Sequence, residues 1–249
     1  MTLDSTIVPV AEPVPRPTAP SVSAFFPCYN DATTIGRLVD DVHQALVQMV
    51  TDLEVIVVND GSTDGSREVL DDLAATRPWL RVIHHIANRG YGGALISGFT
   101  AARNDWIFYT DGDGQYDALE AARLVPLATG DVDVVQGYKL GRGDSMVRKV
   151  IGRGYHHLVK RMFHLPGRDT DCDFRLFRRS LIADDMLTST SGVICVEMMR
   201  RFTESGARFV ETPVHHYPRP SGRSQFFRLP SLVRTARQLW SLWRNTVHR

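Results

Sequence analysis

Short runs of β-forming residues alternate with amphipathic helical stretches from residue 21 to residue 137, and this alternation limits the fold more than any other feature of the sequence. The predicted strands are residues 21–26, 53–59, 80–84, 106–110 and 132–137. The predicted helices lie near residues 32–49, 65–76, 91–103 and 117–128. Strand–helix units in this order predict an α/β domain with an open, mostly parallel sheet and flanking helices.

The loops that follow these strands contain unusual residues. They are PCYND (27–31), DGSTDGS (60–66), NRGYGG (88–93), DGDGQYD (111–117) and GYKLGR (137–142). In an open α/β sheet, ligands bind in the crevice outside the carboxyl ends of the strands. Because all these loops leave such an end, the sequence predicts that they form one pocket.

Composition and charge exclude several classes of protein. The 249 residues have 43% hydrophobic content and a formal net charge of +1, which indicates an ordinary globular domain and not a nucleic-acid-binding protein. Cys28, Cys172 and Cys195 stand far apart and never in a CxxC pair, which argues against a disulfide framework or a zinc site. We expect no signal peptide, because the N-terminus has Asp4 and no basic region before an apolar stretch, and no membrane span, because no uncharged run reaches about 18 residues.

The two ends of the chain differ from its middle. Residues 1–20 are rich in proline, which prevents helix, and we expect a disordered tail there. Residues 229–249 repeat arginines and apolar residues at helical spacing without any acidic residue, which predicts a basic amphipathic helix. Two roles stay open for this helix: it binds an anionic membrane surface, or it packs on the core of the domain.

The apolar run at residues 106–110 ends in two aspartates, Asp111 and Asp113, that are separated by one glycine. Either they form a turn that caps the next helix, or they hold a cation. An EF-hand calcium loop is excluded, because it needs glycine and glutamate where this chain has Tyr116 and Ala122. The remaining kind of site uses one or two carboxylates together with substrate phosphates, which suits Mg²⁺ or Mn²⁺.

Several segments resemble one enzyme family. VVNDGSTDGS (57–66), NRGYGGAL (88–95) and DGD (111–113) resemble the family 2 glycosyltransferases of GT-A fold, with a Rossmann-like sheet. DCDFRLF (171–177) and ETPVHHYPRPSGRSQF (211–226) resemble the dolichol-phosphate mannose synthase-like group of polyprenyl-phosphate hexosyltransferases. The likeness covers about residues 21–228, which we expect to form the GT-A domain. A Rossmann dehydrogenase is the rival, and it would need a GxGxxG pattern that the first loop lacks.

The resemblance implies an inverting transferase that moves a hexose from a nucleotide-diphosphate sugar, GDP-mannose or a UDP-hexose, to a polyprenyl or dolichyl phosphate. It also implies that Asp111, Asp113 and Gln115 hold Mg²⁺ or Mn²⁺, which stabilises the leaving nucleoside diphosphate. The residues expected to be catalytic are Asp111, Asp113, Asp173 and Arg219.

The same resemblance assigns a set of loop residues to the nucleotide sugar. They are Pro27, Tyr29, Asp31, Asp60, Asn88, Gly90 and Asp111. Two of these carboxylates have a purely structural alternative. Asp60, together with Gly61, Ser62 and Asp64, also fits a turn with an N-cap for the helix near residue 65, and Asp31 also fits a cap of the helix near residue 32.

Basic residues gather between residues 139 and 168, where eight Lys or Arg accompany one acidic residue. The residues expected to bind the acceptor phosphate are Lys139, Arg148, Lys149, Arg153 and Ser224. A solvated charged face is the alternative. Because a lipid phosphate is already ionised, Asp171 and Asp173 are expected to position ligands, whereas with a hydroxyl acceptor one of them would be the general base. Arg175 is expected to fix this loop, and Glu197 to pair with Arg175 or with a sugar hydroxyl.

Three functions therefore remain open. The leading one is a transferase that makes a polyprenyl phosphate sugar, peripheral on the cytoplasmic face of a membrane. The second is a soluble family 2 transferase that acts on a hydroxyl of a saccharide or small natural product, and the third is a nucleotide-sugar-binding protein without activity. The expected partners are the donor, the lipid phosphate and an anionic membrane surface, but no nucleic acid. The histidine doublets at 84–85, 156–157 and 215–216 lack metal-site spacing, and we expect no catalytic role for them.

Overall fold

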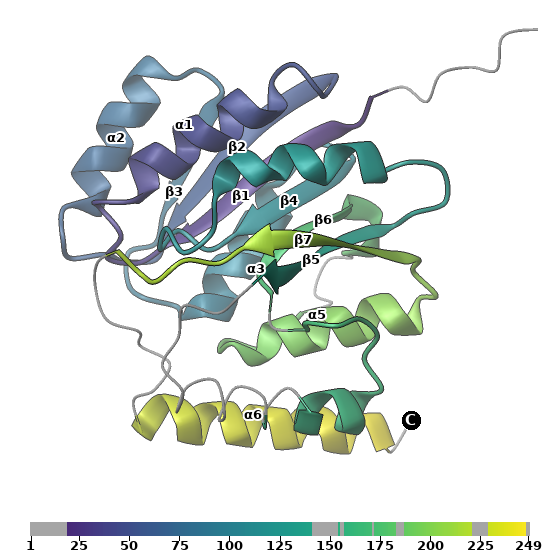
Figure 1. Cartoon of the computed structure of the whole chain (residues 1–249). Coiled ribbons are helices and arrows are strands. Elements are labelled where there is room, and N and C mark those ends of the chain that lie inside the picture. Colours follow the sequence, from purple (N-terminus) through teal and green to yellow (C-terminus); the bar gives the residue numbers. More distant parts are fainter. Residues whose placement is uncertain are drawn as a thin grey trace, which may run out of the picture.

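The computed structural model of the chain describes residues 19–140, 154, 157–170, 172–182, 187–220 and 229–247. A central sheet carries helices on both of its faces (Figure 1). The proline-rich tail expected at residues 1–20 lies almost entirely outside the described residues.

The sheet has seven strands in the order β3-β2-β1-β4-β6-β5-β7. Their bounds are β1 Ser21–Cys28, β2 Asp52–Asn59, β3 Leu80–His84, β4 Trp106–Thr110, β5 Val134–Leu140, β6 Phe174–Arg178 and β7 Phe209–His215. All neighbours pair in parallel except at β6, which runs antiparallel to both β4 and β5. The predicted open, mostly parallel sheet is confirmed.

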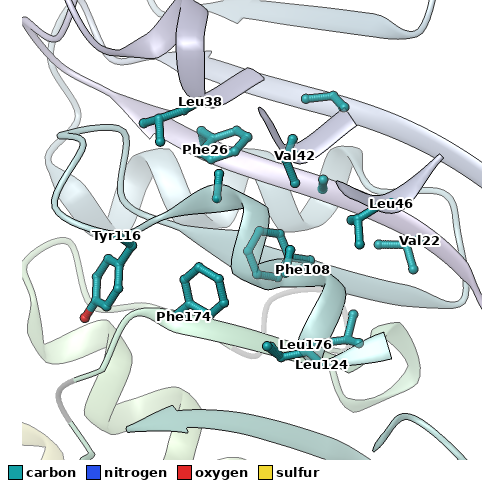
Figure 2. Close-up of a cluster of buried hydrophobic side chains, with 14 of the residues drawn as sticks. Val22, Phe26, Leu38, Val42, Leu46, Phe108, Tyr116, Leu124, Phe174 and Leu176 are labelled. Atoms are coloured by element: carbon teal, nitrogen blue, oxygen red, sulfur yellow. The ribbon is translucent and has the colours of Figure 1, made fainter. Parts of the chain in front are cut away.

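Two apolar layers hold the helices against the sheet. Side chains alternate along a strand, so in β1 Ala24 and Phe26 enter one layer and Phe25 enters the other. The first layer includes α1 (Ile35–Leu46) and α2 (Ser66–Thr76), and the second includes α3 (Tyr91–Ala101) and α5 (Val193–Glu204) (Figure 1). Figure 2 shows the first layer, in which the rings of Phe108 and Phe174 meet edge to face with their centroids 4.9 Å apart.

Three parts of the sheet and its connections differ from the sequence pattern. The helix predicted at residues 117–128 is instead two 3-10 turns, η1 (Ala118–Arg123) and η2 (Val125–Leu127). Pro126, in the first turn of η2, has no N–H to donate and so prevents a continuous α-helix. β6 and β7 add to the five predicted strands. In β6 the fully buried Arg175 occupies a position where a strand of this kind is expected to carry an apolar residue.

The helix α6 (Leu229–Val247) lies beyond α5, on the side away from the sheet (Figure 1). Its buried Leu239 and Leu242 join Val159 and Phe163, from a helical segment that includes residues 157–163, in a third apolar cluster with α5. One face of the expected amphipathic helix therefore packs on the core. In the part of the chain that the structure describes, no helix has both the length and the apolarity needed to cross a membrane.

Candidate active site

Carboxylates from three strands gather at one edge of the sheet. Asp31 lies just beyond β1, and Asp111 and Asp113 follow β4. Asp173 precedes β6, but because β6 runs antiparallel to β4, with Thr110 opposite Phe174, it reaches the same edge as the residues that follow β4. The predicted crevice at the carboxyl ends of the parallel strands thus collects four acidic side chains.

Asp111 is held by one hydrogen bond from the second helical layer. The hydroxyl of Tyr91, at the start of α3, donates to Asp111 Oδ1 over 2.7 Å. Burial, together with the negative charges of Asp173 and Asp113, raises the pKa of the Asp111 carboxyl well above its usual range. A bound cation would reverse this balance, because an adjacent positive charge favours the ionised carboxylate.

Asp113 is paired with Arg219, from the segment that follows β7. Arg219 Nη2 donates to Asp113 Oδ2 over 2.6 Å, and the Gln115 backbone N–H donates to Asp113 Oδ1 over 3.0 Å. The Asp113 side chain is only 8% exposed, so this ion pair is shielded from water. Two of the four residues expected to be catalytic, Asp113 and Arg219, are therefore in direct contact.

Gln115 ties the same loop to the segment beyond β7. Its side-chain amide donates to the Tyr217 carbonyl oxygen over 3.1 Å, and the Tyr217 N–H donates back to the Gln115 carbonyl over 2.8 Å. Within the described residues, no group of three or more His, Cys, Asp or Glu side chains is arranged as a metal site. Asp111 and Asp113 fit a site of the kind in which substrate phosphates supply the other oxygens. The metal role of Gln115 stays a prediction.

Asp31 is a buried acidic residue close to the Asp113–Arg219 ion pair. Its carboxylate accepts a hydrogen bond from the Tyr29 N–H over 3.2 Å and makes no side-chain cap for α1, so the capping alternative is wrong for Asp31. Burial, with the nearby charges of Asp113 and Asp64, raises the pKa of Asp31 to about 6, although the Tyr29 N–H and Arg219 act in the opposite direction.

Asp60 lies directly after β2 and is 3% exposed. Its Oδ1 accepts hydrogen bonds from His85 Nδ1 over 2.6 Å and from the Arg89 N–H over 2.8 Å. The residue that bonds the first turn of α2 is Asp64, whose Oδ1 accepts from the Ser66 N–H over 3.1 Å. Asp64, another member of the expected turn, thus bonds the start of the helix, while Asp60 is held by His85 and Arg89 instead. His85, for which we expected no catalytic role, is a contact that the sequence pattern missed.

The loop at residues 88–93 meets a second loop at residues 187–191. Asn88 Oδ1 accepts from the Gly90 N–H over 3.0 Å, and the Gly92 N–H donates to the Thr190 carbonyl over 3.1 Å. Gly90 has a φ of +83°, and a Cβ there would lie 2.6 Å from the Thr190 oxygen, so only glycine fits. Glu197 accepts from the Ser189 N–H over 2.9 Å and so anchors this second loop, in place of the expected pairing with Arg175.

At the first of the loops, Pro27 supports the turn that carries the aspartate pair. A Cβ on Gly112 would lie 2.5 Å from the Pro27 carbonyl oxygen, so the two loops touch through their backbones. Tyr29 is half-buried beside Asp31. The structure brings Pro27 and Tyr29 to the same edge as the aspartates, and their contact with a nucleotide stays a prediction.

Asp173 belongs to a polar network buried in the sheet. Its Oδ1 accepts from the Tyr109 hydroxyl over 3.1 Å and from Cys195 Sγ over 3.2 Å, and it lies 3.4 Å from Arg175 Nη1. The fully buried Arg175 also binds the Tyr109 hydroxyl and Gln136, and Arg175 Nη2 donates to the Thr170 carbonyl over 2.7 Å. These contacts hold the Asp173 carboxylate in one place, and its role in positioning ligands stays a prediction.

The structure describes only one of the residues expected at the acceptor phosphate, Lys139. Lys139 lies in β5 with its side chain only 12% exposed, and its Nζ is 4.0 Å from Asp169 Oδ2. The other members of the set, Arg148, Lys149, Arg153 and Ser224, lie outside the described residues, as does Asp171. The acceptor site therefore stays a prediction.

Comparison with solved structures gives the fold. Glucosyl-3-phosphoglycerate synthase from Mycobacterium tuberculosis, crystallised with Mn²⁺, UDP and glucosyl-3-phosphoglycerate, superposes with a TM-score of 0.66. The similarity covers 90% of this chain and 78% of that chain at 19% sequence identity, and the same enzyme with Mg²⁺ and UDP gives a TM-score of 0.65. At this identity the likeness establishes the fold, which is the GT-A fold.

Sequence comparison then gives the family. The model of glycosyl transferase family 2 matches residues 23–185, and the chain belongs to that family. It is 31% identical over 207 residues, 82% of its length, to the undecaprenyl-phosphate 4-deoxy-4-formamido-L-arabinose transferase of Edwardsiella ictaluri, and 30% identical over 223 residues, 89% of its length, to that of Yersinia pestis. The chain spans 62% and 66% of these two relatives, just under two thirds of their length.

Proposed function

We propose that the protein is an inverting glycosyltransferase that moves a hexose from a nucleotide-diphosphate sugar, GDP-mannose or a UDP-hexose, to a polyprenyl or dolichyl phosphate. The observation that carries this proposal is the Asp111–Asp113 pair beyond β4, with Arg219 bonded to Asp113 over 2.6 Å. The acceptor class is supported by the relatives from Edwardsiella ictaluri and Yersinia pestis, which are named for transfer to undecaprenyl phosphate.

Asp111 and Asp113 would hold the divalent cation, Mg²⁺ or Mn²⁺. The structural neighbour from Mycobacterium tuberculosis binds both ions with UDP, which supports this choice. When bound, such an ion supplies Lewis-acid stabilisation of the leaving nucleoside diphosphate. Burial, and then the charges of Asp173 and Asp113, raise the pKa of Asp111, and a bound cation would act on it in the opposite direction.

Arg219 supplies a second positive charge to the leaving group. It lies on the segment after β7, and its guanidinium is held at Asp113 over 2.6 Å. Charge that develops on the diphosphate during bond cleavage is stabilised by donors that are already in place. Asp173, fixed by Tyr109 and Cys195, orients ligands beside it, and an ionised acceptor phosphate needs no proton removed.

The proposal includes attachment to the cytoplasmic face of a membrane through α6. The buried face of α6 packs on α5, while its opposite face exposes Trp240 (60%) and Val233 (51%). The exposed arginines on the same helix are Arg234, Arg237 and Arg244. Exposed apolar side chains flanked by cations favour an anionic bilayer, to which each arginine near the surface contributes about 1 kcal/mol. A polyprenyl phosphate has its phosphate at that surface.

Transfer from a panel of radiolabelled GDP- and UDP-sugars to an added polyprenyl phosphate tests the proposal. The expected result is an organic-extractable labelled product that requires Mg²⁺ or Mn²⁺ and is absent with the Asp113→Ala variant. Label that stays aqueous, with donor still bound, would contradict the lipid acceptor and leave the hydroxyl-acceptor transferase. A protein that binds no nucleotide under any of these conditions would contradict the whole proposal.

A further inference from the structure

We infer that the buried chain of contacts Asp60–His85–Ser97 orients Asp60 toward the nucleobase of the donor, which makes His85 and Ser97 positioning residues for donor binding. This inference rests on the proposed function and on the expectation, implied by the family resemblance, that Asp60 contacts the nucleotide. It adds two residues that neither the resemblance nor the predicted motifs include.

One oxygen of Asp60 is fully engaged by the protein. Oδ1 accepts from His85 Nδ1 over 2.6 Å and from the Arg89 N–H over 2.8 Å. Among the described residues, all the hydrogen bonds to the Asp60 carboxylate go to this one oxygen. Two donors on Oδ1 restrain the carboxylate, which leaves Oδ2 to accept from a ligand. A nucleobase that presents N–H donors suits this acceptor.

The His85 ring is fixed from several sides. Because an ionised carboxylate only accepts, Nδ1 must carry the proton that bonds Asp60. The other nitrogen, Nε2, lies 2.9 Å from Ser97 Oγ on α3, and the His85 backbone N–H donates to the Asn59 carbonyl over 2.9 Å. The ring is therefore clamped between the end of β2 and the helix α3. Its side chain is 6% exposed and that of Asp60 is 4% exposed.

A buried pair of this kind points to function more than to stability. Removing two polar groups from water is costly, and apolar residues of similar volume stabilise a core as well or better. The pair lies at the ligand-binding edge of the sheet, where a carboxylate in a defined orientation has a use. Arg89 adds to this arrangement, since its side chain donates to Ser97 Oγ over 3.3 Å and its backbone N–H to Asp60. Asp60 and the loop at residues 88–93 are thus one unit.

Asp60 follows a different strand from the aspartates expected to hold the metal, so its role in donor binding can be tested apart from the chemical step. β1 lies between β2, which carries Asp60, and β4, which carries Asp111 and Asp113. A loosened Asp60 carboxylate should therefore weaken the affinity for nucleotide and leave the metal and leaving-group contacts intact. The expected signature is a raised donor KM with little change in kcat.

The neighbouring His84 provides a matched control. Its Nδ1 lies 3.0 Å from Asn59 Nδ2, and its Nε2 lies 3.0 Å from Asp71 Oδ1 on α2. It is also a histidine bonded to a carboxylate, but it links the sheet to α2 and not to the loop at residues 88–93. Loss of His84 should leave nucleotide affinity unchanged.

The test compares His85→Leu, His85→Asn, Ser97→Ala and His84→Leu with the wild type. Calorimetry with UDP and GDP gives Kd, transfer assays give donor KM and kcat, and thermal melts report folding. We expect His85→Leu to raise Kd and donor KM about tenfold, and Ser97→Ala about threefold, with kcat within about twofold. His85→Asn keeps an N–H near the position of Nδ1 and should recover most of the affinity, and His84→Leu should match the wild type.

A folded His85→Leu variant with wild-type Kd would overturn the inference while the proposed function stands. If His85→Leu does not fold, Ser97→Ala decides, and a wild-type Kd in that variant overturns the inference in the same way. A wild type that binds neither UDP nor GDP would overturn the proposed function, and the inference with it.

Discussion

The N-terminal half of the structure, residues 19–117, and its C-terminal half, residues 134–247, contribute to the site in different ways. In the N-terminal half, functional carboxylates are held by neighbours in consecutive strand–helix units, such as Tyr91 on Asp111 and His85 on Asp60. In the C-terminal half, the side chains come from segments distant in the chain, and Arg219 binds Asp113 across the boundary. The first half thus supplies three of the four carboxylates, Asp31, Asp111 and Asp113, and the second half supplies Asp173 and the guanidinium of Arg219.

The difference between the two halves indicates which functions separate substitutions should affect. Contacts within the N-terminal half fix the shape of the crevice. Loss of the His85 contact should affect donor binding, and loss of the Tyr91 contact should affect metal binding. Contacts from the C-terminal half, including Gln238 of α6, which accepts from Ser191 Oγ over 2.6 Å, brace the loops from outside. Four variants can break or sharpen this division, in order of decreasing effect.

Asp113→Ala should give the largest loss, about a thousandfold in kcat, because it removes a cation-binding oxygen and leaves Arg219 without its carboxylate. Turnover with saturating Mg²⁺ or Mn²⁺ is the measurement, and chelation of the metal from the wild type should reproduce the loss. Full activity in this variant would refute the metal assignment.

Arg219→Ala should lower kcat about a hundredfold, because the leaving diphosphate loses a positive charge that the C-terminal half supplies. Arg219→Lys is the control, and it should recover only part of the rate because an ammonium lacks the fork geometry of a guanidinium. If both variants changed only the donor KM, Arg219 would belong with the binding residues of the N-terminal half.

Asp31→Asn should stabilise the protein without ligand at neutral pH. The folded-state pKa of Asp31 is raised to about 6 from 3.8, mainly by burial, so its contribution to stability is present below pH 3.8 and is lost as pH rises through about 6. The asparagine does not titrate. The free energy of unfolding of the variant minus that of the wild type should therefore be roughly 2 kcal/mol larger at pH 7.5 than at pH 4. Urea unfolding at both pH values measures this, and an equal difference at the two would contradict the raised pKa.

Trp240→Ala should give the smallest effect, a loss of about fivefold in binding to anionic liposomes, with nucleotide Kd unchanged. Trp240 is 60% exposed on α6, so the fold should keep its stability. The matched variant Leu239→Ala, on the buried face of the same helix, should instead lower the free energy of unfolding by about 2–4 kcal/mol. If Trp240→Ala bound liposomes as well as the wild type in sedimentation at low salt, only the packing role of α6 would remain.

The two halves also differed in how far the sequence could predict them. β1 to β4 were predicted within two residues, because buried parallel strands are apolar runs bounded by turn residues. β6 was not, since Arg175 is the second residue of FRLFR and only its contacts with Tyr109, Gln136 and Thr170 make that position suitable for an arginine. A side chain whose partners come from other strands leaves no local pattern.

The same reason explains the residues missed in the site. Asp111, Asp113 and Asp60 follow strands, so the rule for open α/β sheets predicts their place. His85 gives no such signal, because its role depends on Ser97, which lies on the other side of the loop at residues 88–93. The pairing of Arg219 with Asp113 joins residues 106 positions apart and rests on tertiary structure alone.

The antiparallel β6 has a consequence for the synthesis of this protein. β6 lies between β4 and β5 in the sheet but follows both in the chain. Until β6 leaves the ribosome, β4 and β5 each present an edge of unsatisfied backbone groups that can pair with another chain. A nascent chain released before Arg178 should therefore aggregate, and completion of the sheet is coupled to translation of its second half.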